Sequence, residues 1–237
     1  MRVFVLTGAG VSAESGLGTF RDEHGTGGGI WARFDPMKLA TPEAFARDPA
    51  AVHGFYDMRR RHLLAAKPNA AHVALAGLEA GLAARGGSVF LCTQNIDDLH
   101  ERAGSRAVHH MHGELLKARC TRCGTVAPWR DALSVATACP ACGRAGGMRP
   151  DVVWFGEMPR GLDRIEAELG AAGLFVAIGT SGAVYPAAGY VAEARALGIP
   201  TVEVNLAPSD NARAFDEARY GPATETVPAL VAALLAG

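Results

Sequence analysis

The start of the chain places a short apolar segment, residues 3–6, directly before a glycine-rich turn and a stretch typical of a helix. A strand that turns on glycine into a helix presents backbone N–H groups and the positive end of the helix dipole to a bound pyrophosphate. The spacing Gly8-x-Gly10-x-x-Ala13 also fits the relaxed dinucleotide fingerprint, with alanine in the third place. We therefore expect an α/β sheet whose first strand ends at a nucleotide site, with free N–H groups in the turn.

Two features of the usual fingerprint are missing. An acidic residue that binds the ribose is expected about 20 residues further along, and Gly28 and Gly29 occupy that region. The next convincing apolar strand begins only at Val89. The opening segment therefore predicts nucleotide binding and leaves the chemistry open.

Apolar, β-branched runs alternate with helical patterns along the rest of the chain. The expected strands are residues 3–6, 89–92, 152–155, 174–178, 201–204 and 225–227, and the expected helices are residues 72–84, 162–169, 187–197 and 227–235. This alternation is typical of an α/β fold with a mostly parallel sheet that helices cover on both faces.

Two segments interrupt the alternation. Residues 24–69 hold a glycine-rich stretch and then helix-like pieces, one of which opens at Thr41 with Pro42 in its first turn. Residues 117–150 hold four cysteines. We expect these two segments to form a smaller domain beside a main domain of residues 1–23, 70–116 and 151–237.

Charge and hydropathy exclude several classes of partner. The 237-residue chain has a net charge of −1, so no overall positive field attracts nucleic acid or an anionic membrane. No apolar run approaches the roughly 18 residues of a membrane span. Residues 1–3 resemble the start of a signal peptide, but the apolar stretch is too short and no cleavage site follows. We expect a cytoplasmic protein with no nucleic-acid or membrane partner.

The cysteines predict a structural zinc site. Cys120 and Cys123 form one Cys-x-x-Cys pair, and Cys139 and Cys142 form another, with 15 residues between the pairs. Four thiolates at this spacing fill all positions of a tetrahedral zinc ion and leave none for catalysis. A nucleic-acid-binding zinc ribbon is the less favoured alternative, because Trp129 is the one aromatic residue near the pairs. Cys92 is expected to be a small buried apolar residue.

Polar residues follow the expected strand at residues 89–92. Gln94, Asn95 and Asp97 come where ligands bind in open α/β sheets, at the carboxyl end of a strand. A capped helix start is an equally good reading, because Asn and Asp are good N-cap residues. His112 then precedes a glycine and is a candidate general base.

Together these motifs closely resemble the sirtuins, the NAD-dependent protein deacylases. The resemblance covers nearly the whole chain and rests on Gly8–Gly16 with Thr19-Phe20-Arg21, Thr93–Asp97, His112-Gly113, the four cysteines, Val153–Glu157, Gly179–Ser181 and Asn205-Leu206. It implies a Rossmann-like NAD-binding domain and a smaller domain made of a zinc module (117–150) and a helical module (24–69), with the active cleft between them.

The resemblance also implies a role for individual residues. His112 would act as general base on a ribose hydroxyl, and Asn95 and Asp97 would position the ribose and the nicotinamide amide. NAD would contact Gly8, Ala9, Gly10, Ser12, Ala13, Glu14, Phe20, Arg21, Gln94, Asn95, Ile96, Asp97, Gly179, Thr180, Ser181, Asn205, Leu206 and Ala223. The acyl-lysine of a protein or peptide would lie against Val153, Phe155 and Gly156. The products would be free lysine, nicotinamide and 2′-O-acyl-ADP-ribose.

Tyr56 and Arg59 bear on the choice of acyl group. They are three residues apart in an expected helix and so share one face. An Arg fork binds a carboxylate in a bidentate manner, and a Tyr adds a hydroxyl donor. The pair resembles the desuccinylase and demalonylase branch of the sirtuins, class III, and Thr19 also fits that branch. A solvated basic face is the alternative, because Arg60 and Arg61 follow at once.

Some features depart from the family pattern. Ala207 stands where many sirtuins carry Glu, and residues 25–29 are unusually rich in glycine for a loop that closes over NAD. A mainly deacetylating enzyme, an ADP-ribosyltransferase on the same scaffold and a non-catalytic binding module remain alternatives. We expect a monomer.

Overall fold

The computed structural model describes residues 1–19 and 34–237. Its main sheet has six parallel strands in the order β3-β2-β1-β7-β8-β9. Predicted residues Phe20 and Arg21, and the glycine-rich stretch at residues 25–29, lie outside the described residues. The strands of this sheet are β1 (Arg2–Thr7), β2 (Ser88–Thr93), β3 (Val108–His110), β7 (Leu174–Ile178), β8 (Thr201–Asn205) and β9 (Glu217–Tyr220).

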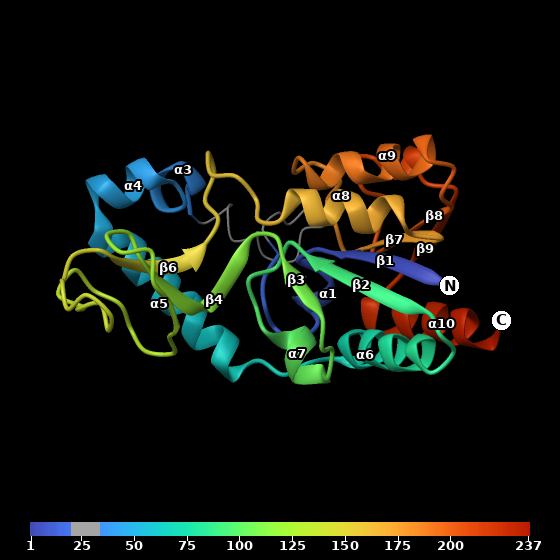
Figure 1. The fold of residues 1–237 in the computed structure, drawn as a ribbon, viewed down its shortest axis with the longest axis horizontal. Helices are drawn as coiled ribbons and strands as arrows, with labels where there is room; N and C mark the ends of the chain where they lie inside the picture. The colour runs from blue at the N-terminus through green and yellow to red at the C-terminus, as the bar shows by residue number, and fades with distance from the viewer. Residues whose placement is uncertain (20–33) are drawn as a thin grey trace.

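Helices cover both faces of this sheet, as predicted (Figure 1). Val3 and Val5 of β1 pack with α6 and α10, whereas Phe4 and Leu6 pack on the other face with α8 and α9. Side chains of a strand point to alternate faces, so a fully apolar β1 is buried from both sides. The helices are α1 (Gly10–Ala13), α6 (Ala70–Ala83), α7 (Leu99–Ala103), α8 (Leu162–Gly170), α9 (Tyr190–Ala196) and α10 (Ala223–Ala236), with short 3₁₀ turns η1 (Ala187–Gly189) and η2 (Ala212–Ala214).

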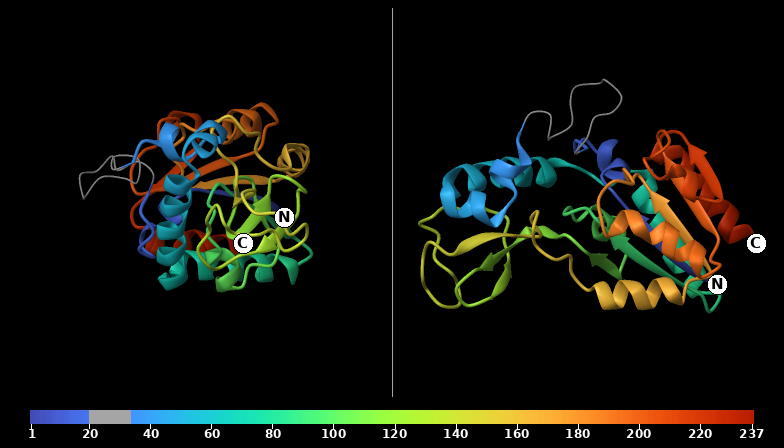
Figure 2. Two further views of the ribbon diagram at one scale, coloured as in Figure 1. Left: turned by 90° about the vertical axis from the view of Figure 1, so that its left-hand side faces the viewer. Right: turned by 90° about the horizontal axis from the view of Figure 1, so that it is seen from above.

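A smaller unit lies at one end of the molecule (Figure 2). In the part of the chain that the structure describes, it combines three helices with an antiparallel sheet in the order β5-β4-β6. Tyr56, Leu115 and Trp154 belong to the apolar cluster that joins these helices to the sheet. Its elements are α3 (Pro36–Leu39), α4 (Pro42–Arg47), α5 (Pro49–Ala65), β4 (Gly113–Cys120), β5 (Val126–Pro128) and β6 (Met148–Val152). The sheet therefore extends beyond the predicted zinc module at both ends.

Two expected strands are wrong. Residues 225–227 lie in α10, where the Glu14 carboxylate accepts hydrogen bonds from the backbone N–H and the hydroxyl of Thr224 in the first turn. A short β-branched run does not by itself distinguish a strand from a helix, and this contact supports the helix. Residues 153–155 follow β6, which ends at Val152 and pairs with β4 rather than entering the main sheet. None of the helices in the described residues is long and apolar enough to cross a membrane.

The four cysteines of the two Cys-x-x-Cys pairs converge in the smaller unit. Their sulfur atoms all lie within 4.8 Å of one another, with 3.9 Å between Cys120 and Cys142 and 3.6 Å between Cys123 and Cys139. A tetrahedral ion with Zn–S bonds of about 2.3 Å separates its sulfur atoms by about 3.8 Å. The donor set and its spacing therefore fit one structural zinc ion. Cys92 is buried in the core of the main domain, as predicted.

Removing one cysteine pair should release the zinc. We expect the double variant Cys120→Ser, Cys123→Ser to lose its zinc, measured by atomic emission, and to melt at least about 10 °C lower, since each kcal/mol corresponds to about 2–4 °C in a domain of this size. Cys92→Ala is the control and should retain one zinc per chain. A double variant that retains a full equivalent of zinc would contradict this assignment.

Candidate functional site

One large cavity of about 800 Å³ lies at the carboxyl ends of the parallel strands and reaches the smaller unit. Parallel sheets bind ligands at this edge. Most of the predicted site residues line the cavity: Gly8, Ala9, Gly10, Ala13, Glu14, Tyr56, Arg59, Gln94, Asn95, Ile96, His112, Val153, Phe155, Gly156, Gly179, Thr180, Ser181, Asn205, Leu206 and Ala223. The tertiary structure thus brings together residues that the sequence distributes over eight separate segments.

The glycine turn after β1 packs directly against the end of β7. The N–H of Gly8 donates to the carbonyl of Ile178, and the N–H of Gly10 donates to the carbonyl of Gly179, both at 2.9 Å. A Cβ atom on Gly8 would lie 2.6 Å from the carbonyl oxygen of Gly179, so no larger residue fits there. This corrects the expectation of free N–H groups at these two glycines, which serve close backbone packing. The helix that follows, α1, is one short turn.

Asn95 is fixed against the same turn. Its side-chain nitrogen donates to the carbonyl of Gly8 at 3.1 Å and to the hydroxyl of Ser12 at 3.2 Å. The Ser12 hydroxyl donates to Asp97 at 3.0 Å, and the other Asp97 oxygen accepts from the N–H of Leu99 at the start of α7. Asn95 therefore faces the cavity, whereas the N-cap residue of α7, Asp98, makes no side-chain cap and the helix start is supported by Asp97 instead.

Ser12 and Asp97 lie behind the cavity wall and are not among the residues that line it. Burial raises the pKa of Asp97, although hydrogen bonds from Leu99 and Ser12 act in the opposite direction. His72, which the sequence did not single out, is 3.3 Å from the Ser12 hydroxyl, and burial lowers its pKa to about 4. The sequence signal for His72 is its place at the third position of α6, where it completes a capping box with Asn69.

Two histidines hold the backbone of the Gln94–Asn95 segment. Nδ1 of His112 is 3.0 Å from the carbonyl oxygen of Gln94, and Nδ1 of His110 is 3.2 Å from that of Asn95. A carbonyl oxygen only accepts, so Nδ1 of His112 carries the proton and Nε2 keeps a lone pair. Burial lowers the pKa of His112, with the Gln94 hydrogen bond acting against it. The buried imidazole is therefore neutral and able to accept a proton at Nε2.

The pKa of His110 shifts in the opposite direction from that of His112. Burial acts to lower its pKa, but the hydrogen bond and charge of Glu101, with Glu114 and the Asn95 carbonyl, raise it overall. His109 bonds to the carbonyl of Arg160 at 2.9 Å. Each of these three histidines thus has its own hydrogen-bond partner. In the part of the chain that the structure describes, only the four cysteines are arranged to hold a metal ion.

The ends of β7 and β8 form the opposite wall. The side-chain nitrogen of Asn205 donates to the carbonyl of Thr180 at 2.8 Å, and its oxygen accepts from the N–H of Leu206 at 3.0 Å. These contacts join the two strand ends. Leu206 is 62% exposed and lies on the cavity rim. Ala207 also lines this wall.

Tyr56 and Arg59 line the part of the cavity that α5 forms. The Arg59 guanidinium carbon lies 5.9 Å from the centre of the Tyr56 ring. Burial raises the pKa of Tyr56 to about 12. Burial also lowers the pKa of Arg59, and the charges of Tyr56 and Asp97 partly offset this lowering. Arg60 instead pairs with Asp57, and Arg61 is exposed. The expectation of a shared helix face is confirmed, and that face lines the cavity rather than open solvent.

Comparisons with known proteins agree with this geometry. The Sir2 family model matches residues 8–186. The chain is 64% identical over 236 residues to the NAD-dependent protein deacylase of Caulobacter vibrioides, covering 100% of this chain and 98% of the relative. A solved complex of a Sir2 homologue with NAD superposes with a TM-score of 0.86 at 40% identity, covering 98% of this chain and 89% of the other. A Sir2 complex with a p53 peptide and NAD⁺ gives 0.77 at 29% identity, covering 99% and 92%. The chain therefore belongs to the Sir2 family, the sirtuins.

Proposed function

We propose that this NAD-dependent protein deacylase prefers acyl-lysines whose acyl group ends in a carboxylate, such as succinyl-lysine and malonyl-lysine. The observation that carries the proposal is the placement of Tyr56 and Arg59 on one face of α5, lining the same cavity as His112. An acyl-lysine that reaches His112 extends its far end toward the smaller unit, to which α5 belongs.

Arg59 suits an acidic acyl group on electrostatic grounds. Its planar guanidinium can bind both oxygens of a carboxylate, and such charge-assisted pairs are stronger in a cavity from which water is excluded. Burial disfavours the charged form of Arg59, as the direction of its pKa shift shows. A substrate carboxylate would offset that cost, whereas an acetyl group would not.

The remaining roles follow from the positions of the side chains. When bound, NAD supplies the ADP-ribose acceptor for the acyl group and releases nicotinamide. His112 accepts a proton from a ribose hydroxyl at Nε2, while its Nδ1–H stays on the Gln94 carbonyl. Asn95 orients the ribose from a position fixed by Gly8 and Ser12. The ends of β7 and β8, including Ser181 and Asn205, bind the ADP portion.

Arg59→Met should remove the preference. We expect the wild type to show a higher kcat/KM on a succinyl-lysine peptide than on the matched acetyl-lysine peptide. Loss of a buried contact between Arg and carboxylate costs about 2–5 kcal/mol, so succinyl activity should fall at least about 30-fold in the variant. Arg61→Met, on the exposed face of α5, is the matched control and should leave both activities unchanged. Preference of the wild type for acetyl-lysine would overturn the proposal.

The pH dependence of the deacylase activity should report the protonation of His112. Its pKa lies below the usual 6.5, so the neutral imidazole persists at lower pH and activity should fall only as the pH drops below 6.5. The acid limb of kcat/KM, which reports groups of the free enzyme, should have its midpoint below that value. His112→Ala should lower kcat about 100-fold or more across the profile. A midpoint above 6.5 would show that another group controls activity.

Product analysis distinguishes deacylation from ADP-ribosyl transfer. Mass spectrometry of a succinyl-lysine peptide with NAD should show free lysine, nicotinamide and succinyl-ADP-ribose in equal amounts. Omission of NAD should leave the peptide intact. A peptide or enzyme whose mass rises by one ADP-ribose, without loss of the acyl group, would instead favour the transferase.

A further inference from the structure

We propose that Trp154 is a positioning residue that orients the hydroxyl proton of Tyr56 toward the carboxylate of an acidic acyl group. We further propose that Arg149 and Glu157 hold Trp154 in the orientation that this requires. The inference rests on the proposed preference for acidic acyl-lysines and identifies three residues that would support it, two of which, Trp154 and Arg149, are almost fully buried.

A hydrogen bond joins Trp154 to Tyr56. The indole N–H of Trp154 donates to the phenolic oxygen of Tyr56 at 2.9 Å. An indole nitrogen can only donate, so the Tyr56 oxygen must accept, and its own proton must point elsewhere. Among the described residues no second partner for this hydroxyl is present, and Tyr56 lines the cavity. The free proton is therefore available to a ligand in the cavity.

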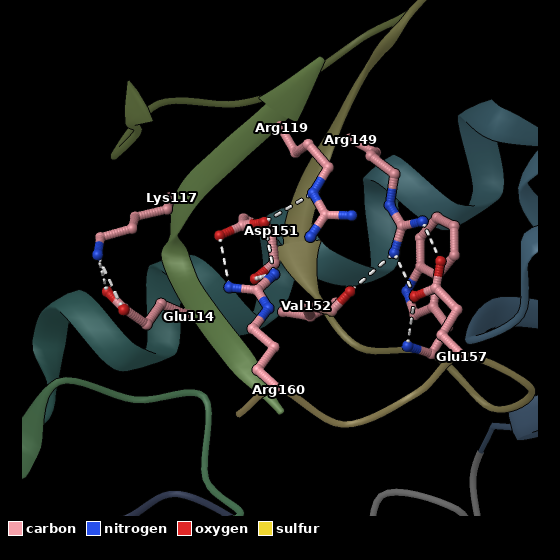
Figure 3. A network of polar contacts seen from close by, with 9 residues as sticks. Glu114, Lys117, Arg119, Arg149, Asp151, Val152, Glu157 and Arg160 are labelled. Carbon is pink, nitrogen blue, oxygen red and sulfur yellow. Dashed lines mark hydrogen bonds and ion pairs between the residues drawn. The ribbon is translucent and has the colours of Figure 1, made fainter. Parts of the chain in front are cut away.

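Trp154 is held in place by its surroundings. It is 2% exposed, and its backbone N–H donates to Glu157 at 2.8 Å. The guanidinium carbon of Arg149 lies 3.3 Å from the centre of the indole, a cation–π contact. Arg149 also forms a two-pronged ion pair with Glu157, at 2.7 and 3.0 Å, and donates to the carbonyl of Val152 at 2.7 Å (Figure 3).

These contacts fix the direction of the hydroxyl before substrate binds. A phenolic hydroxyl rotates about its C–O bond, and a donor held on one side of the oxygen restricts that rotation. A donor that is already oriented loses less entropy when it binds a carboxylate. An acetyl group carries no carboxylate, so the orientation should affect acidic acyl groups alone. A purely structural Trp154 would affect both substrates alike.

The test is the ratio of kcat/KM on succinyl-lysine to kcat/KM on acetyl-lysine in Trp154→Phe. This substitution keeps a ring beneath Arg149 and removes the N–H. We expect the ratio to fall about 3- to 10-fold, mainly through KM for the succinyl peptide. In a Tyr56→Phe background the same substitution should leave the ratio unchanged, because the hydroxyl is already absent. Trp129→Phe, in the zinc module, is the matched control and should keep the wild-type ratio.

Both activities are measured on one preparation, so the ratio does not depend on the fraction of folded enzyme. Should Trp154→Phe fail to fold, Glu157→Gln weakens the support of Arg149 and should shift the ratio in the same direction. An unchanged ratio in a succinyl-preferring enzyme would overturn this inference alone. An equal fall in the Tyr56→Phe background would also overturn it. A wild type that prefers acetyl-lysine would overturn the proposed function, and this inference with it.

Discussion

The site depends on the backbone contact between the turn after β1 and the end of β7. Gly8 and Gly10 approach Gly179 so closely that a side chain on any of the three would collide with backbone atoms. This contact sets where the two central strands end relative to each other. It also aligns the segment after β2, because Asn95 bonds to the Gly8 carbonyl. The positions of the strand ends that border the cavity are therefore a consequence of main-chain packing.

Buried polar groups extend this rigid base behind the cavity. The chain of contacts from Asn95 through Ser12 to Asp97 satisfies polar atoms that would be costly to bury alone. His110 and His112 then fix the adjoining carbonyls from β3 and the residues that follow it. Because every side chain of this network is hydrogen-bonded, the network holds the cavity wall in one geometry. A site that must align two substrates requires such a fixed wall.

Strongly apolar elements could be predicted from the sequence, and weakly patterned ones could not. β1, β2, β7 and β8 are buried over most of their length, so their runs of apolar residues identify them. β9 is an exposed edge strand, and β3 has three half-buried residues, so neither has a clear apolar run. The four cysteines were predicted together, because tetrahedral zinc chemistry requires that donor set and spacing. The link from Trp154 to Tyr56 could not be predicted, because 98 residues separate them.

The sequence by itself determined the fold class, the zinc ligands, the family and more than half of the residues that line the cavity. These follow from local patterns and from motifs whose residue types are specific to a chemistry. The tertiary structure decided that the Gly8 and Gly10 amides are occupied, that Asp97 lies behind the wall, and that Tyr56 and Arg59 face the cavity. Each of these depends on contacts between distant segments, and such contacts exist only once the chain has folded.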